Sequence, residues 1–205
     1  MKLLLHTCCA PCSIQCVEAL AEEGIGPDLY WYNPNIHPYT EYRSRLNSLR
    51  VFAEERTLPL VIDDDYGLRS FIKAVSSIEE SPADKNMEGK SRCAYCYRFR
   101  LEKAAALAAE KAYNAFSTTL LISPYQNHEL LWQIGEELAG IYHIDFLYRD
   151  FRPRYRKGRE QARAAGFYMQ KYCGCIYSEE ERYLGKKAEA SGGKISGGKA
   201  SGGST

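Results

Sequence analysis

Five short apolar runs alternate along the chain with longer segments in which hydrophobic residues recur at helical spacing. Each run is too short for a helix, so we expect a strand at each of them. The predicted strands are residues 2–6, 28–32, 58–62, 115–122 and 144–148. Because strands that alternate with helices form parallel units, we predict a single α/β domain with a mostly parallel sheet covered by helices on both faces.

Segments of helical periodicity follow these strands and are bounded by polar or glycine-containing turns. The predicted helices begin at Ser13, after Thr40, at Leu68, at Arg92 and at about Glu129. Residues 77–91 are polar and contain proline and glycine, which predicts a loop or a mobile lid. Residues 190–205 contain only small and polar residues apart from Ile195, so we expect one domain over 1–189 and a disordered Gly/Ser/Lys tail over 190–205.

The composition is typical of a soluble globular protein, since the 205 residues are 45% hydrophobic and 26% charged. A formal net charge of +1 gives no overall attraction to nucleic acid, so any basic binding surface must be local. No apolar run approaches the roughly 20 residues that a membrane span needs, and the first run is too short for a signal peptide. We therefore expect a cytoplasmic protein without a membrane partner.

Eight cysteines fall into three separate groups, and none lies outside them. The groups are Cys8, Cys9, Cys12 and Cys16, then Cys93 and Cys96, then Cys173 and Cys175. In a cytosolic chain of this size, structural disulfides are disfavoured, and metal binding or redox chemistry is the more common use of cysteine. The grouping therefore indicates metal or redox chemistry rather than a disulfide framework.

The first thiols follow the first predicted strand directly and precede a helix that begins near Ser13. Ligands bind at the carboxyl edge of an open α/β sheet, and a helix N-terminus there adds free N–H groups and partial positive charge. We therefore predict that the loop of Cys8, Cys9 and Cys12 holds a metal centre. Cys16 lies within the helix and is predicted to be a packing residue.

Cys93 and Cys96 form a C-x-x-C pair, which suits a zinc half-site, a redox dithiol or half of an iron–sulfur ligand set. Structural zinc sites usually combine two pairs of similar spacing, whereas the other pair here is the adjacent Cys8 and Cys9. Iron–sulfur clusters accept irregular spacing of four thiolates. An iron–sulfur cluster is therefore favoured, and buried inert thiols are the alternative.

Cys173 and Cys175 are separated only by Gly174, so a bond between them would close a small, strained ring. Strained disulfides tend to be the labile, catalytic ones. We therefore predict a redox-active pair. The alternatives are that the two thiols are extra metal ligands or have no chemical role.

Other polar residues are candidates for catalysis or substrate binding. His6 lies inside a strand and is predicted to be a hydrogen-bonded core residue, whereas residues 63–65 are predicted to be a solvated acidic loop. His37 follows an Asn-Pro-Asn turn and is either a ligand or a core residue. A segment that interleaves basic and aromatic residues suits an RNA loop, the alternative being an ordinary solvated helix start. Its residues are Arg149, Arg152, Arg154, Tyr155, Arg156 and Lys157.

Five longer motifs occur in a fixed order between residues 2 and 178. They are His-Thr-Cys-Cys-Ala-Pro-Cys from His6, Asn-Pro-Asn-Ile-His-Pro from Asn33, Arg-Cys-x-x-Cys-Tyr-x-x-Arg-Leu from Arg92, Ser-Thr-Thr-Leu from Ser117, and Tyr-Cys-Gly-Cys-x-Tyr-Ser from Tyr172. Together they resemble the QueH family, the cobalamin-independent epoxyqueuosine reductases of tRNA queuosine biosynthesis. By this resemblance, residues 1–189 are an iron–sulfur reductase domain.

The resemblance implies an oxidoreductase that converts epoxyqueuosine to queuosine at the tRNA wobble position, the last step of queuosine biosynthesis, with an external electron donor and no cobalamin. It implies a redox-active disulfide between Cys173 and Cys175, and a 4Fe–4S cluster beside an additional mononuclear iron. Cys12 and His37 are candidates for contacts with that iron. The implied cluster ligands are Cys8, Cys9, Cys93 and Cys96.

The resemblance also implies a fold similar to the PP-loop ATPases, which have a HUP-like Rossmann fold. The first cysteine loop would then occupy the place of their phosphate loop, but it has no glycines here, so we expect no ATP. Three other functions stay open: a zinc-stabilised RNA-binding module, an ATP-dependent tRNA-modifying enzyme of PP-loop type, and a thiol–disulfide oxidoreductase that uses only Cys173 and Cys175.

Overall fold

The computed structural model describes residues 1–79 and 90–185. Its strands form one parallel sheet in the order β3-β2-β1-β4-β5. They are β1 (Leu3–His6), β2 (Pro27–Trp31), β3 (Leu60–Ile62), β4 (Ala115–Thr118) and β5 (Asp145–Phe146). In the central strand, Leu3 pairs with Pro27 on one side and with Ala115 on the other. The predicted α/β class with a parallel sheet is confirmed.

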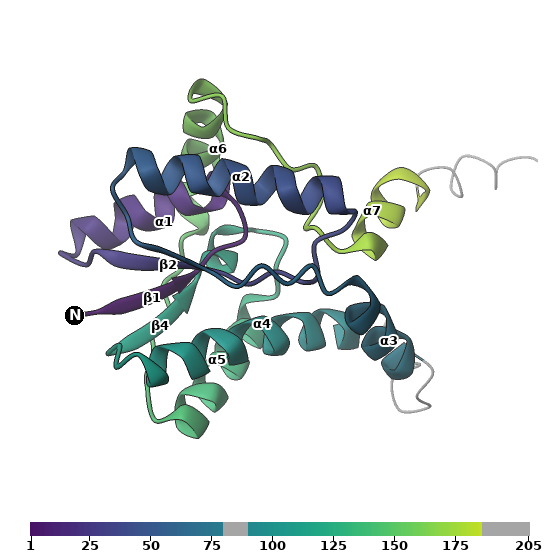
Figure 1. Cartoon of the computed structure of the whole chain (residues 1–205), viewed down its shortest axis with the longest axis horizontal. Helices are drawn as coiled ribbons and strands as arrows, with labels where there is room; N and C mark the ends of the chain where they lie inside the picture. Colours follow the sequence, from purple (N-terminus) through teal and green to yellow (C-terminus); the bar gives the residue numbers. More distant parts are fainter. Residues whose placement is uncertain (80–89, 186–205) are drawn as a thin grey trace, which may run out of the picture.

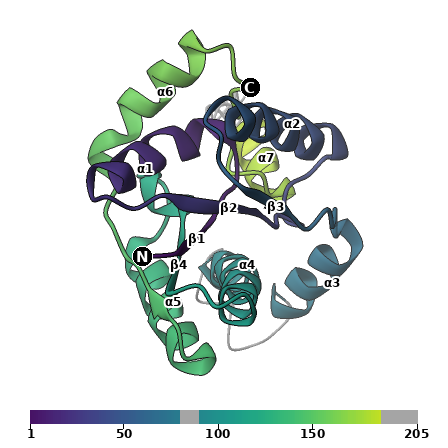
Figure 2. The same cartoon turned by 60° about the vertical axis from the view of Figure 1, so that its left-hand side comes forward.

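Helices cover both faces of the sheet (Figure 1 and Figure 2). One face carries α1 (Ala10–Glu22) and α2 (Tyr39–Glu55), and α6 (Tyr155–Ala164) packs against α1. The other face carries α3 (Leu68–Glu79), α4 (Lys90–Glu110) and α5 (His128–Tyr142). Two 3-10 helices, η1 (Thr119–Ile122) and η2 (Arg152–Arg154), lie in connections, and α7 (Ile176–Tyr183) lies beyond the carboxyl ends of the strands (Figure 1).

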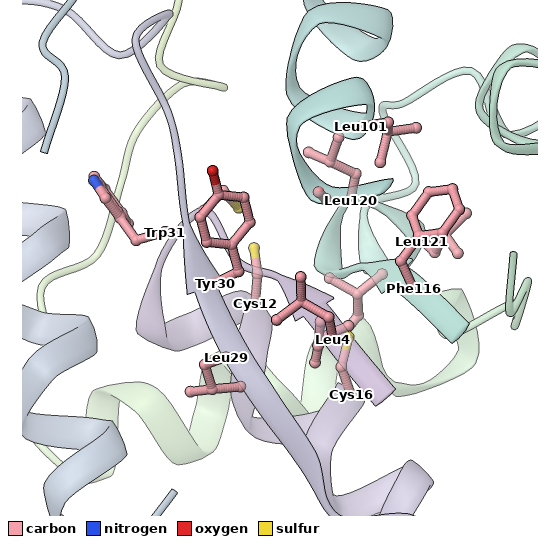
Figure 3. Packing of buried hydrophobic residues seen from close by; sticks show 14 of the residues in the cluster. Leu4, Cys12, Cys16, Leu29, Tyr30, Trp31, Leu101, Phe116, Leu120 and Leu121 are labelled. Carbon is pink, nitrogen blue, oxygen red and sulfur yellow. The ribbon is translucent and has the colours of Figure 1, made fainter. Parts of the chain in front are cut away.

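The core lies between these layers, because a parallel sheet covered on both faces buries nearly every residue of its central strands. Leu4 of β1, Phe116 of β4 and Leu101 of α4 are fully buried members of this core (Figure 3). Cys16 is also fully buried within this cluster, which confirms it as a packing residue. No helix of the described ranges is long and apolar enough to cross a membrane.

Several elements differ from the prediction in their bounds, and two helices were not predicted. The strand predicted over 115–122 ends at Thr118, because its side chain accepts a hydrogen bond from the Leu120 N–H and begins η1. The helix predicted from Ser13 already begins at Ala10, since proline fits the first turn of a helix. Helices α6 and α7 were not predicted, because α6 buries only Gly158 and Ala162 and α7 has no buried residue.

The predicted lid over 77–91 is partly helical, since α3 extends to Glu79 and α4 begins at Lys90. Residues 80–89 lie outside the described ranges. The predicted tail over 190–205 lies outside them too, so the division of the chain at residue 189 stays a prediction.

Candidate metal centre

Three thiols converge at the carboxyl end of β1. The Sγ atoms of Cys8, Cys9 and Cys12 all lie within 4.8 Å of one another, and those of Cys8 and Cys9 are 3.8 Å apart. The three residues are at most 8% exposed. They lie where the strand order reverses between β1 and β4, which is the usual ligand position in such sheets. Since thiolates are strong ligands for iron and zinc, this group could hold a metal.

The loop keeps its shape through contacts with both neighbouring strands. The Thr7 N–H donates to the Tyr30 carbonyl at 2.8 Å and so extends the pairing of β1 with β2. The Cys8 N–H donates to Thr119 Oγ1 at 3.3 Å, and the Thr119 hydroxyl donates to Cys8 Sγ at 3.7 Å. Cys9 is the extended N-cap residue of α1, and no side chain caps this end. The first N–H groups of α1 therefore remain available beside the thiols.

The three thiols have different affinities for protons. Hydrogen bonds from Cys12 and Cys9 hold the pKa of Cys8 well below its usual range, and the charges of Arg45 and Arg100 lower it further. Burial raises the pKa of Cys9, and the hydrogen bond with Cys8 raises the pKa of Cys12. One thiolate shared among three sulfur atoms suits metal binding, because the thiolate is the form that binds metal.

Gln170 also contacts this group, although nothing in its sequence surroundings distinguishes it. Its Nε2 donates to Cys9 Sγ at 3.0 Å and to Cys12 Sγ at 3.4 Å. Its Oε1 is buried and has no hydrogen-bond partner in the described part of the chain. A buried polar atom beside three thiols is consistent with a further bound group at this position.

Cys93 and Cys96 lie three residues apart in the N-terminal part of α4 and are not members of the group of three. Cys93 is exposed, whereas Cys96 packs with Phe71, Val75 and Cys175. Burial raises the pKa of Cys96 to about 12. The structure thus forms two thiol groups, one from the loop after β1 and one from α4.

Cys173 and Cys175 are free thiols, so the structure does not support the disulfide that the resemblance implied. Cys173 is exposed, and its Sγ donates to Ser178 Oγ at 2.9 Å. Cys175 is buried beside Cys96, and burial raises its pKa to about 11. One thiol of the pair is therefore exposed to solvent, and the other packs in the same cluster as Cys96 of α4.

Arg45 of α2 holds the backbone of this pair, a role that the sequence pattern did not reveal. Its Nη1 donates to the Cys173 carbonyl and its Nη2 to the Tyr172 carbonyl, each at 2.9 Å. Arg45 is 1% exposed, and its Nε lies 2.6 Å from Glu41 Oε1, so its charge is paired. The His37 N–H donates to the Gly174 carbonyl at 2.8 Å and fixes the other side of the loop.

The two histidines of the early motifs have different surroundings. His6 is confirmed as a core residue, since Nδ1 lies 2.9 Å from Thr118 Oγ1 and Nε2 lies 3.2 Å from the Tyr32 carbonyl. His37 is fully buried, yet neither ring nitrogen has a hydrogen-bond partner among the described residues, nor does either amide atom of the nearby Asn35. Its ring packs against Phe71, which contacts Cys96. His37 is therefore the histidine with free ligand atoms near the thiols.

The basic segment after β5 is largely paired with carboxylates. Arg149 pairs with Glu23, Arg154 with Glu22, Lys157 with Glu18, and Arg152 with Asp150. Glu22 ends α1, a helix about 20 Å long whose other end carries the thiols. In the acidic run of residues 63–65 after β3, Asp64 has a structural role, since it accepts hydrogen bonds from Tyr42 and Arg43 of α2.

Fold and site together define an α/β protein with buried thiols at the switch point of a parallel sheet. A family model described as "Epoxyqueuosine reductase QueH" matches residues 3–181. The chain therefore belongs to the QueH family.

Three relatives of that name support this assignment. The protein of Dehalococcoides mccartyi is 40% identical over 182 residues, covering 89% of this chain and 94% of its own. That of Acinetobacter baylyi is 39% identical over 181 residues, covering 86% and 80%. That of Thermotoga maritima is 32% identical over 183 residues, covering 88% and 91%. A solved Methanocaldococcus jannaschii structure, described as a predicted subunit of tRNA methyltransferase, matches with a TM-score of 0.49 and 16% identity, covering 78% and 74%.

Proposed function

We propose that this chain reduces epoxyqueuosine in tRNA to queuosine. The observation that carries the proposal is the buried group of Cys8, Cys9 and Cys12 at the switch point of the sheet, in a chain of the QueH family. Removing an epoxide oxygen as water and leaving an alkene consumes two electrons and two protons. Thiols next to a ligand position can serve such chemistry because they bind metals and also carry electrons and protons.

We propose four thiols as the ligands of a 4Fe–4S cluster, which would supply single electrons when bound. The set is Cys8, Cys9, Cys93 and Cys96. The donor chemistry fits, because all four are free thiols and the two elements that carry them both lie within reach of the Arg100 charge. We propose Cys12 and His37 as contacts for an additional iron, since His37 offers two unpartnered nitrogens.

Cys173 and Cys175 are proposed as a redox-active pair. Oxidation of two thiols to one disulfide releases two electrons and two protons, which equals what the epoxide consumes. The exposed Cys173 is accessible to an external electron donor, whereas the buried Cys175 lies next to Cys96. One exposed and one buried sulfur suit a pair whose disulfide form accepts electrons at the surface and whose thiol form passes them inward.

The tRNA-binding surface is proposed to include the segment of residues 149–157. Arg156 is exposed and forms no ion pair among the described residues. Tyr125, which is 82% exposed, lies edge-on to Tyr155 with ring centroids 6.1 Å apart. The loop of Tyr125 is fixed to α4 because the Tyr97 hydroxyl donates to Gln126 at 2.8 Å. Tyr125 is therefore an exposed aromatic side chain close to the helix that carries Cys96.

Anaerobic purification with metal analysis tests the proposed function. We expect a brown protein with about four or more irons per chain and broad absorbance near roughly 400 nm. Cys96→Ser should lose this absorbance, whereas the matched variant Cys16→Ser, which alters a packing thiol, should keep it. Cys175→Ser should keep the absorbance and lose turnover with the physiological reductant.

Other results would favour the alternatives. A colourless protein that holds zinc contradicts the proposal and favours a zinc-stabilised RNA-binding module. Unchanged turnover of Cys175→Ser would show that the pair of Cys173 and Cys175 has no redox role.

A further inference from the structure

Arg100 of α4 is a buried cation without an acidic partner. The residue is 3% exposed, and its Nε donates to the Cys96 carbonyl at 3.1 Å. Within residues 1–79 and 90–185, no carboxylate forms an ion pair with it. Burying an unpaired charge is strongly unfavourable, so a fold that retains this guanidinium requires a compensating negative charge nearby.

The other buried arginine of the site satisfies this requirement. Arg45 is as deeply buried as Arg100, but Glu41 lies 2.6 Å from its Nε. Arg98, two residues before Arg100 on α4, pairs with Glu137 at the surface. Arg100 thus differs from both Arg98 and Arg45, because each of those arginines is paired with a carboxylate.

The groups around Arg100 indicate what supplies the negative charge. The titratable groups close enough to raise the pKa of Arg100 are the thiols Cys96, Cys8 and Cys173 and the hydroxyl of Tyr97. Cys8 belongs to the loop after β1, whereas Cys96 belongs to α4. Arg100 is therefore bonded to the backbone of one thiol group and lies within electrostatic range of the other. Protonated thiols carry no charge, but thiolates bound to a metal do.

We propose that Arg100 is the counter-charge of the iron–sulfur centre and raises its reduction potential. The inference rests on the proposed function, since it takes the thiols of both groups to be metal ligands. Reduction adds an electron to a centre that is already negative. A fixed positive charge in a low-dielectric interior stabilises the reduced form more than the oxidised form. Arg100 thus acts on the centre through its positive charge and is not itself a metal ligand.

The test measures the reduction potential of the reconstituted protein by an anaerobic spectroelectrochemical titration, together with iron content and thermal unfolding. Arg100→Gln removes the charge, Arg100→Lys keeps it, and Arg98→Gln is the matched control on the same helix. We expect Arg100→Gln to bind iron at a lower potential. At a fixed potential its ratio of reduced to oxidised centre should fall at least tenfold, which is about 59 mV for one electron. The other two variants should stay near the wild type.

Each remaining outcome is informative. An Arg100→Gln protein with a full complement of iron and an unchanged potential overturns the inference and leaves the proposed function intact. If Arg100→Gln binds no iron, Arg100→Lys decides: a lysine variant that holds iron at the wild-type potential supports the role of charge. A folded lysine variant without iron shows instead that the guanidinium acts through its shape. A wild-type protein that binds no iron overturns both proposals.

Discussion

Gly174 shows how a single residue sets the geometry of the thiol pair between α6 and α7. Its φ of +122° lies in a region that residues with side chains rarely adopt. A Cβ atom at this position would lie 2.9 Å from Ile36 Cγ1 and 3.1 Å from Arg45 Nη1. Glycine is therefore needed both for the backbone conformation and for the close approach of the loop to Arg45.

Gly174→Ala should destabilise the protein by about 2–3 kcal/mol, because backbone strain of roughly 1–3 kcal/mol adds to the close contact. The matched variant is Gly166→Ala, where φ is +72° but nothing lies within 4 Å of the added atom. It should cost only about 1 kcal/mol. Urea unfolding of both proteins measures the difference. Equal losses would show that the contact with Ile36 and Arg45 contributes nothing.

At the residue scale, the sequence revealed the thiols but not the side chains that surround them. Cysteines stand out by spacing alone, and motif order connected the three groups. Arg45 and Gln170 act through partners more than 100 positions away in the chain, so no local pattern marks them. The pairing of a buried polar side chain is decided by tertiary packing, which sequence periodicity does not report.

Helix α2 carries a buried ion pair that contacts the loop of Tyr172 and Cys173. Glu41 and Arg45 lie one helical turn apart, and Glu41 also accepts a hydrogen bond from the Tyr168 hydroxyl. The arginine then donates to two carbonyls of the loop. Helix and loop are therefore connected by charge-assisted hydrogen bonds, which are stronger than those between neutral groups.

Arg45→Leu should destabilise the protein by about 3–5 kcal/mol, because it leaves the buried Glu41 carboxylate without a cationic partner. The control Arg43→Ala, also on α2, removes a surface ion pair with Asp64 and should cost less than about 1 kcal/mol. Chemical unfolding measures both. The double variant Arg45→Leu/Glu41→Leu should recover part of the loss, since it removes the unpaired charge as well. An Arg45→Leu protein as stable as Arg43→Ala would contradict the stabilising role of the ion pair between Arg45 and Glu41.

Elements with a strong apolar pattern could be predicted, and elements without one could not. All five strands were located because each is a local run of apolar residues. Helices α6 and α7 could not be predicted because few or none of their residues are buried, and the end of β4 was missed because a side-chain hydrogen bond of Thr118 begins η1 there. Hydrophobic periodicity therefore predicts elements that bury a continuous apolar face, but not helices that bury few residues or that begin at a side-chain cap.

At the scale of the whole molecule, the charges are nearly balanced both in total and locally. The formal net charge is +1, and the basic segment after β5 is largely paired with carboxylates of α1 and of its C-cap residue Glu23. Phosphate contacts must therefore come from few cations, or displace existing ion pairs. An RNA loop can also be bound through base stacking, which does not depend on net charge.

Tyr125→Ala should weaken binding of an anticodon stem-loop RNA by about 5- to 150-fold, the equivalent of roughly 1–3 kcal/mol for one stacked base. Tyr125→Phe keeps the ring and should bind like the wild type. Trp132→Ala is the aromatic control, since Trp132 is 44% exposed on α5. Fluorescence anisotropy at several salt concentrations measures all four proteins. The slope of log K against log salt should be about −1.4, the value for two phosphate contacts to a single strand. A much steeper slope, with Tyr125→Ala unchanged, would show that the basic segment releases its carboxylates and binds the RNA by charge instead.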